Sequence, residues 1–344
     1  MEDRMTPKER VGAFLGGQPI DRVVCAPLIL NHAARVLGVK VSEHNRDGEM
    51  MGKAHLAAYR RYHQDMITIF TDTAVLAEAM GTELYYPEDD AARVEKPVVQ
   101  SAADVDKVQM ADVHTDGRLP VHLEAIRHCC EAVGAEVFVS CCYGAPFTTA
   151  ACLRGTDMLA RDLRRDPGLA HELLGKSLEV ALRFTDAVVE AGGVPVVVDP
   201  VATGSILSPA MFEEFAAPYI APMMQRIKEK GLPAMLHICG KTHRLFEQMA
   251  DTGADVLSLD VVDLAEARER VGDRVTLMGN VRPAETLLRG TPEQVEAEAR
   301  ECLEKAKDNP KGFILASGCE VPLGSPFENI DALMAAARKY GQFA

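Results

Sequence analysis

Three residues of the types that bind soft metal ions follow two apolar segments of the chain. Residues 234–236 have the character of a buried strand, and His237 and Cys239 come directly after them. Because strand side chains alternate in direction, these two side chains are expected on the same side. Cys319 follows a second apolar segment, residues 313–316. One histidine and two cysteines predict a catalytic zinc site, since three protein ligands leave the fourth tetrahedral position open for a substrate.

Apolar segments of strand length alternate with helical segments along the whole chain. Eight of them are centred near residues 23, 66, 137, 196, 235, 256, 275 and 313. This alternation predicts an α/β protein built as a (β/α)8 TIM barrel. We expect a single domain that spans residues 1–344, because barrels of this length commonly form one domain. A short N-terminal helix starting at Thr6-Pro7 should precede the barrel, and residues 84–118 read as an irregular insertion that could hold a short hairpin.

The composition limits the partners of the protein. Its formal net charge of −14 argues against nucleic acid or an anionic membrane surface as a partner. The charged N-terminus does not resemble a signal peptide, and no apolar run reaches the roughly 20 residues of a membrane span, so a cytoplasmic location is expected. The nine cysteines, an odd number in such a chain, are expected to be free or metal-bound thiols.

Four further polar residues stand at the ends of predicted strands, namely Asp72, Asp199, Asp260 and Asn280. The active site of a TIM barrel lies at the carboxyl ends of its strands, so these four are predicted to be catalytic residues. Asp72 and Asp199 would orient His237 or the substrate. An equally weighted alternative is that the aspartates cap helix N-termini, and that Asn280 is a turn residue.

The zinc ion has room for a fourth ligand in its resting state. Asp260, at the end of the strand that follows Cys239, is the first candidate. The next acid along the chain is Asp263, and a water molecule is the third alternative.

Several motifs resemble one known family. They are Leu-His-Ile-Cys-Gly at residues 236–240, the segment 279–288, Ser-Gly-Cys at residues 317–319, and Pro-Phe-Glu-Asn-Ile at residues 326–330. In these motifs the sequence resembles the uroporphyrinogen decarboxylase superfamily, and within it the methylcobalamin:coenzyme M (thiol) methyltransferases. The resemblance implies a (β/α)8 barrel with zinc bound by His237, Cys239 and Cys319.

The same resemblance implies an activity. A zinc-dependent methyltransferase of this branch moves a methyl group from a methylated corrinoid, either methylcobalamin or a corrinoid protein, to a small thiol such as coenzyme M. A zinc-bound thiol is deprotonated, whereas a free thiol with a pKa near 8.5 is mostly protonated at neutral pH and is a poor nucleophile. The expected partners are therefore a methylated corrinoid protein and a small thiol.

Three other functions are kept as alternatives. Uroporphyrinogen decarboxylase shares Asp72, but its arginine-bearing N-terminal signature is absent here, where no arginine occurs between residues 28 and 34. Its active-site tyrosine and late histidine correspond to Cys152 and Cys319. A donor-side methyltransferase, which loads the corrinoid from a methoxylated compound or a methylamine, would share the fold, as would a non-catalytic corrinoid-protein chaperone. Neither Arg154 nor Arg282 can be assigned to the sulfonate of coenzyme M.

Overall fold

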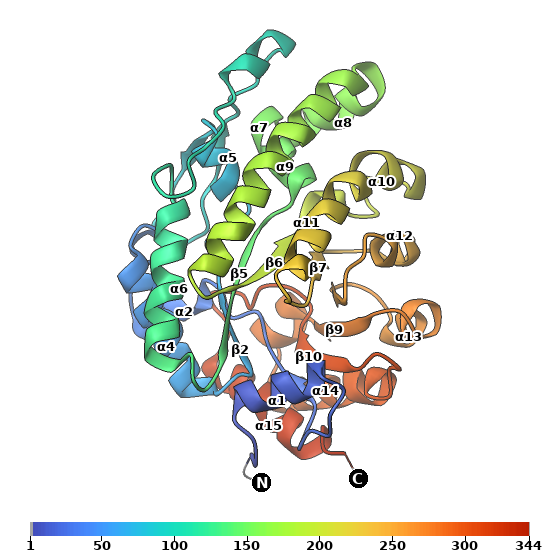
Figure 1. The fold of residues 1–344 in the computed structure, drawn as a ribbon. Coiled ribbons are helices and arrows are strands. Elements are labelled where there is room, and N and C mark those ends of the chain that lie inside the picture. Colours follow the sequence, from blue (N-terminus) through green and yellow to red (C-terminus); the bar gives the residue numbers. More distant parts are fainter. Residues whose placement is uncertain (1–2, 344) are drawn as a thin grey trace.

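Eight parallel strands form the centre of the molecule, and helices surround them (Figure 1). The structure, a computed structural model, describes residues 3–343. The strands pair in the order β1-β10-β9-β8-β7-β6-β5-β2, which is a nearly closed barrel, so the predicted TIM barrel is confirmed. The barrel strands are β1 (Val24–Cys25), β2 (Met66–Ile69), β5 (Phe138–Gly144), β6 (Val194–Val198), β7 (Met235–Ile238), β8 (Val256–Leu259), β9 (Thr276–Val281) and β10 (Phe313–Ser317).

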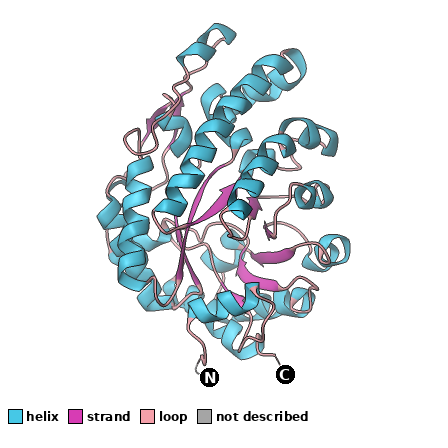
Figure 2. Ribbon diagram, in the orientation of Figure 1, coloured by secondary structure: helices cyan, strands magenta, loops and turns pink. Residues whose placement is uncertain are grey.

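Helices follow the strands and form the outer layer of the barrel (Figure 2). Both ends of the chain lie on one side of the molecule, at the bottom of Figure 1. The α-helices are α1 (Pro7–Leu15), α2 (His32–Leu37), α3 (Val41–His44), α4 (Gly48–Tyr62), α5 (Val75–Ala79), α6 (Leu119–Val133), α7 (Pro146–Arg154), α8 (Thr156–Arg165), α9 (Pro167–Glu190), α10 (Pro209–Phe215), α11 (Ala217–Glu229), α12 (Phe246–Asp251), α13 (Leu264–Val271), α14 (Pro292–Ala306) and α15 (Phe327–Tyr340). Short 3-10 helices cover Ala102–Lys107 and Pro200–Ala202, and a π-helix covers Pro283–Leu288.

Local sequence signals explain where several helices begin. Thr6 caps α1 and forms the expected capping box with Glu9, and Thr291 does the same for α14. The segment 209–223 has the apolar spacing of one helix, but the structure divides it into α10 and α11. Pro218, which has no N–H to donate, lies in the first turn of α11, where that loss is tolerated.

The join between the first and last parts of the barrel is irregular. The apolar segment 22–30 predicts a longer strand, yet only Val24–Cys25 pairs with β10, and Pro27 lacks the N–H that continued pairing would need. Asp65, at the start of β2, connects the two sides instead. Its N–H donates to the Cys25 carbonyl at 2.9 Å, and its carboxylate accepts from the Cys25 N–H at 2.6 Å.

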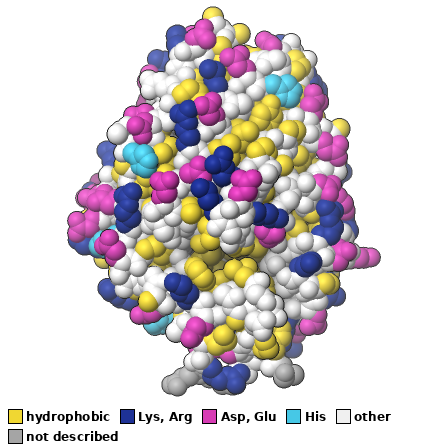
Figure 3. All heavy atoms as spheres, in the orientation of Figure 1, with side chains coloured by type: hydrophobic (Ala, Val, Ile, Leu, Met, Phe, Trp, Pro, Cys, Tyr) yellow, Lys and Arg dark blue, Asp and Glu magenta, His cyan; other side chains and the backbone are white. Residues whose placement is uncertain are grey.

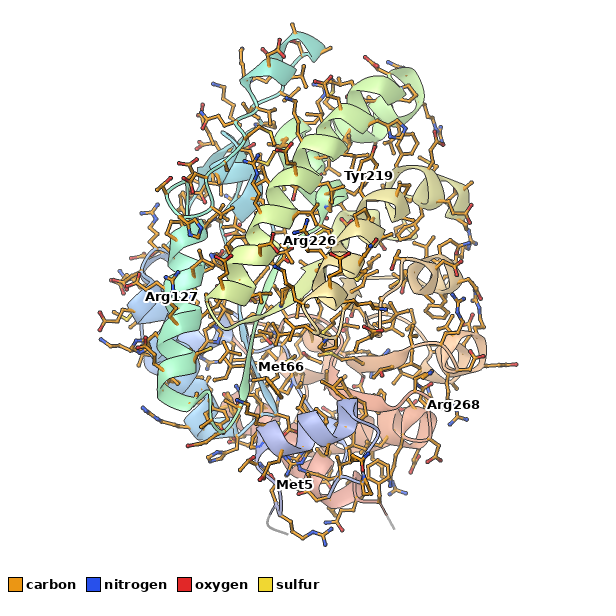
Figure 4. All side chains as sticks on the ribbon, viewed as in Figure 1. Met5, Met66, Arg127, Tyr219, Arg226 and Arg268 are labelled. Atoms are coloured by element: carbon orange, nitrogen blue, oxygen red, sulfur yellow. The ribbon has the colours of Figure 1, made fainter. Side chains whose placement is uncertain are left out.

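Two buried arginines complete this join. Arg10 and Arg22 each place a guanidinium nitrogen 2.6 Å from the Asp65 carboxylate, and all three side chains are buried. A buried carboxylate is stable only when its charge is paired and hydrogen-bonded. Helix α1 is thereby held across the amino ends of the strands, near Met66, which is labelled in Figure 4.

An antiparallel hairpin departs from the barrel after α5. It consists of β3 (Glu83–Tyr85) and β4 (Arg93–Lys96), which are drawn as the small magenta pair at the upper left of Figure 2. Apart from its first residue, Glu83, it lies in the insertion predicted near residues 84–118. On the face shown in Figure 3, basic and acidic side chains are interspersed. Among residues 3–343, no helix is both long and apolar enough to cross a membrane.

Candidate metal centre

The barrel brings His237, Cys239 and Cys319 together, and we refer to them as the HCC cluster. His237 belongs to β7 and Cys239 follows that strand, whereas Cys319 follows β10. The His237 Nε2 lies 3.0 Å from the Cys239 Sγ, which lies 3.3 Å from the Cys319 Sγ. All three ligand atoms fall within 4.8 Å of one another. Residues 80 positions apart therefore meet because parallel strands end at the same side of the barrel.

The geometry of the HCC cluster fits zinc. Tetrahedral bonds of about 2.3 Å to sulfur and about 2.0–2.1 Å to nitrogen would separate the ligand atoms by about 3.5–3.8 Å. The observed separations of 3.0 and 3.3 Å are shorter by about half an ångström. Small side-chain rotations would open the cluster by that amount. Two thiolates and one imidazole also suit zinc better than a hard cation such as Mg²⁺.

A serine on the neighbouring strand orients the histidine. In the parallel register His237 lies opposite Ser258 of β8, and the Ser258 Oγ is 2.9 Å from the His237 Nδ1. This contact leaves Nε2 facing the two sulfurs. An Nδ1–H that donates to the hydroxyl oxygen would therefore hold the tautomer that ligates a metal through Nε2.

The two sulfurs of the HCC cluster share a hydrogen bond. This bond raises the pKa of the Cys239 thiol and lowers the pKa of Cys319, with His237 also favouring the Cys319 thiolate. The pair thus retains a proton on Cys239 in the metal-free protein. A metal ion must displace that proton, so its affinity should rise with pH.

A cavity of about 170 Å³ opens beside the HCC cluster, and we call it the inner cavity. Most of its walls are apolar, and Glu320 is its one acidic wall residue. The Glu320 Oε1 accepts hydrogen bonds from the backbone and side chain of Asn31 at 3.1 and 3.0 Å. Burial raises the pKa of Glu320 to about 7. The residues that line the inner cavity are Leu28, Leu30, Phe70, Thr73, Cys142, Val196, Val198, Pro200, Met235, His237, Cys239, Ser258, Cys319 and Glu320.

Asp260 contacts the residues next to both cysteines of the HCC cluster. Its Oδ2 accepts a hydrogen bond from the Gly240 N–H at 2.8 Å, and its Oδ1 lies so close to Gly318 that a Cβ there would be 2.8 Å away. The carboxylate therefore packs between the two loops that carry the cysteines. Burial, and to a smaller extent the nearby Cys319, raise the pKa of Asp260. The structure does not place it among the atoms within 4.8 Å of one another that form the cluster.

Asp263, the second candidate for a fourth ligand, has another role in this structure. It is the N-cap of α13, and its Oδ1 accepts a hydrogen bond from the Ala265 N–H at 2.7 Å. Its other oxygen pairs with Lys305 at 3.2 Å. The side chain is half-exposed on the outer surface, so the structure brings Asp260 near the cysteines and leaves Asp263 apart.

Asn280 fixes the loop that contains Asp260. Its Nδ2 donates to the backbone carbonyls of Asp260 and Val262, both at 2.8 Å. Asn280 lines a groove of about 650 Å³ outside the strands together with Asp263, and it is not a wall residue of the inner cavity.

The two remaining aspartates lie at strand ends but outside the inner cavity. Asp199 accepts hydrogen bonds from the N–H and the hydroxyl of Thr148 at 2.8 and 2.6 Å, near the start of α7. Its burial raises its pKa to about 7, and its Oδ2 has no hydrogen-bond partner in the described part of the chain. Asp72 forms a 2.7 Å ion pair with Arg118 and accepts from the Ala74 N–H. Asp199 thus binds the first turn of α7, and Asp72 binds the residue that precedes α5.

Sequence reasoning missed two residues beside the HCC cluster. Ser258 interrupts the apolar strand Val256–Leu259 and lies two residues before Asp260, which was a signal that a polar group faces the barrel interior. Glu320 directly follows Cys319, but an acid at that place has no pattern of its own. Only the fold shows that it faces the inner cavity.

Comparisons with known proteins agree with this architecture. The family model described as uroporphyrinogen decarboxylase (URO-D) matches residues 6–340, so the chain belongs to the uroporphyrinogen decarboxylase family. Within that family it is similar to the methylcobamide:CoM methyltransferase MtaA of Methanosarcina barkeri, with 30% identity over 97% of this chain and 98% of the relative.

The chain is also similar to a decarboxylase and to a methyltransferase of known structure. The uroporphyrinogen decarboxylase of Photobacterium profundum is 27% identical over 86% of this chain and 85% of its own length. Among solved structures, a methyltransferase from Methanosarcina mazei superposes with a TM-score of 0.89 at 29% identity, covering 98% of this chain and 99% of the other. The chain is thus a methyltransferase homologue with a URO-D-like barrel, and its HCC cluster could bind zinc.

Proposed function

We propose that this protein is a zinc-dependent methyltransferase that moves a methyl group from a methylated corrinoid to a small thiol. The observation that carries the proposal is the HCC cluster, which supplies three soft ligands at the carboxyl ends of the strands and faces the inner cavity. Three protein ligands leave one coordination position for a substrate. The similarity to MtaA of Methanosarcina barkeri supports a methylated corrinoid as the donor.

Five polar residues at or near the strand ends have positioning roles in this proposal. Ser258 holds the tautomer of His237, and Asp260 braces the loops of both cysteines. Asn280 holds the loop of Asp260. We propose that Asp72 and Asp199 act in the same indirect way, by anchoring the strand ends through Arg118 and Thr148.

The reaction needs a deprotonated acceptor thiol and a methyl donor, in a site from which water is excluded. Zinc held by the HCC cluster would supply the positive charge that keeps an acceptor thiol deprotonated at neutral pH. In the transfer step the acceptor sulfur forms a bond to the methyl carbon, and the electron pair of the cobalt–carbon bond leaves with cobalt, which becomes cobalt(I). The apolar walls of the inner cavity exclude water from the sulfur.

The proposal is tested by zinc content and by methyl transfer together. The wild type is expected to bind one zinc ion per chain and to demethylate free methylcobalamin in the presence of a small thiol. Cys239→Ala should lose most of the zinc and the activity. A matched control is Cys129→Ala, because Cys129 is buried between α6 and α4 and far from the cluster. A Cys239→Ala variant that keeps both zinc and activity would refute the proposal.

The decarboxylase alternative makes a different prediction about the inner cavity. A porphyrinogen with eight carboxylates requires several cationic partners. No lysine or arginine is among the residues found to line the inner cavity, and Glu320 would repel such a substrate. Decarboxylation of uroporphyrinogen by the zinc-free protein would favour that alternative. Methylation of a corrinoid by a methoxylated compound or a methylamine, without thiol turnover, would favour a donor-side methyltransferase.

A further inference from the structure

Among the residues that the structure describes, one acidic side chain lines the inner cavity. Glu320 follows the cluster ligand Cys319 and faces the same cavity as the sulfurs. Its hydrogen bonds within residues 3–343 come from the neutral groups of Asn31, with no lysine or arginine paired to it. A carboxylate accepts hydrogen bonds through both oxygens, and a counter-charge or further donors stabilise its ionised form when it is buried. The partner that Glu320 lacks in the protein could come from the substrate.

Three arginines of the chain are committed to acidic side chains. Arg118, Arg154 and Arg282 are all held by acidic side chains and do not line the inner cavity. Arg118 contacts two carboxylates, so that this group carries a net negative charge. Their acidic partners are Asp72 and Glu78 for Arg118, Asp162 for Arg154, and Glu298 for Arg282.

A second acid adds to the negative potential near Glu320. Besides burial, the negative charge of Asp90, in the loop between β3 and β4, raises the pKa of the Glu320 carboxyl. The Asn31 Oδ1 is a further buried acceptor with no donor in the described structure. The surroundings of Glu320 thus offer acceptors and negative charge, and an anionic substrate tail would meet repulsion there.

We propose that the acceptor thiol carries a cationic group, such as a primary ammonium, which binds Glu320 while its sulfur enters the open position at the HCC cluster. This inference rests on the proposed function and narrows its substrate class. The inner cavity of about 170 Å³ has room for a thiol of a few heavy atoms. An ammonium has three donors, so it can pair with the Glu320 carboxylate and still reach a neighbouring acceptor. Coenzyme M, whose tail is a sulfonate, lacks this complementarity.

Three thiols of equal chain length provide the test, with free methylcobalamin as the methyl donor. They are 2-mercaptoethylamine, 2-mercaptoethanol and 2-mercaptoethanesulfonate, whose tails are cationic, neutral and anionic. Because the intrinsic reactivity of the three sulfurs differs, the readout is the ratio of kcat/KM between the wild type and Glu320→Gln for each thiol. The amide keeps the shape and the acceptor oxygen of the side chain but removes its charge.

The expected result is a change in preference. Glu320→Gln should lower kcat/KM for the amine by about tenfold or more, change the value for the alcohol by less than about threefold, and raise the value for the sulfonate. The zinc content of the variant should equal that of the wild type. Glu301→Gln is the control, since Glu301 lines the outer groove and pairs with Lys305, and its three ratios should stay near one.

Two results would overturn the inference without touching the proposed function. One is a wild type that prefers the sulfonate to the amine after each kcat/KM is divided by the rate constant of the same thiol with methylcobalamin in the absence of protein. The other is a Glu320→Gln variant that changes kcat/KM for all three thiols equally. If Glu320→Gln fails to fold, the corrected wild-type order of the three thiols decides between the outcomes. A zinc-loaded wild type that methylates none of the thiols would refute the proposed function and this inference with it.

Discussion

The hydrogen bond that the His237 Nδ1–H donates to the Ser258 hydroxyl gives a quantitative test of the metal centre. Ser258→Ala removes the hydroxyl oxygen that lies 2.9 Å from the His237 Nδ1. In the metal-free protein the imidazole can respond by moving its proton to Nε2, where the Cys239 sulfur at 3.0 Å accepts it. Ligation through Nε2 excludes that tautomer and leaves Nδ1–H as a donor. The loss of Ser258 is therefore expected to weaken the metal-bound state specifically.

The size of the loss in zinc affinity follows from the free-energy cost of leaving the His237 Nδ1–H without an acceptor. Both residues are buried, with 1% of Ser258 and 4% of His237 exposed, so water does not readily replace the hydroxyl. A buried donor without an acceptor costs about 1–3 kcal/mol. With about 1.4 kcal/mol per tenfold change, zinc affinity should fall by about 5- to 150-fold. Loss of an outer-shell partner of a ligating histidine commonly costs about 10- to 100-fold, which lies in the same range.

Competition against a chromophoric chelator would measure this change at fixed pH. Ser140→Ala is the matched control, because Ser140 is also a fully buried strand serine, bonded to the Ile67 carbonyl and to Thr68 in β2. It should lower the free energy of unfolding without changing zinc affinity. The reasoning fails if Ser258→Ala binds zinc within about twofold of the wild type, or if both variants lose affinity equally.

Three further predictions concern residues around the barrel. His55 is fully buried, and neither of its ring nitrogens has a hydrogen-bond partner among residues 3–343, so burial lowers its pKa. Below about pH 6.5 the unfolded chain therefore binds a proton that the folded chain does not bind, and the free energy of unfolding decreases as the pH falls. Urea titrations should show that His55→Leu loses about 2 kcal/mol less than the wild type between pH 7 and pH 5, and equal losses would contradict this. Asp65→Asn removes the negative charge that two buried arginines share, so it should lower the free energy of unfolding by about 3 kcal/mol or more. A loss below about 1 kcal/mol would argue against the ion-pair network. Gly318→Ala places a Cβ 2.8 Å from the Asp260 carboxylate and should lower kcat/KM about tenfold or more. The control is Gly324→Ala, whose Cβ meets only the flexible Leu288 side chain at 3.2 Å and should leave kcat/KM unchanged.

Much of the fold could be predicted because its determinants are local. The bounds of Leu119–Val133 match the apolar period of its segment, and those of Leu264–Val271 match both the apolar period and the Asp263 cap. The eight strands follow from apolar runs that are buried on both faces, as parallel strands require. The shortness of β1 was not predictable, since it depends on Pro27 and on the contacts of Asp65 across the join.

In the candidate site too, some features could be predicted from the sequence, and others depend on the tertiary structure. By itself, the sequence singled out the three side chains of the HCC cluster, because one histidine and two cysteines that follow apolar strands predict a site for a soft metal ion. It also placed Asp72, Asp199, Asp260 and Asn280 at strand ends.

Only the tertiary structure decided which of these groups face one another. Whether a strand-end side chain enters the barrel or contacts the surrounding layer depends on strand register and on the neighbouring loops, which are contacts between residues far apart in the chain. That is why Ser258 and Glu320 emerge beside the HCC cluster, while Asn280 and Asp263 hold loops and a helix outside the inner cavity.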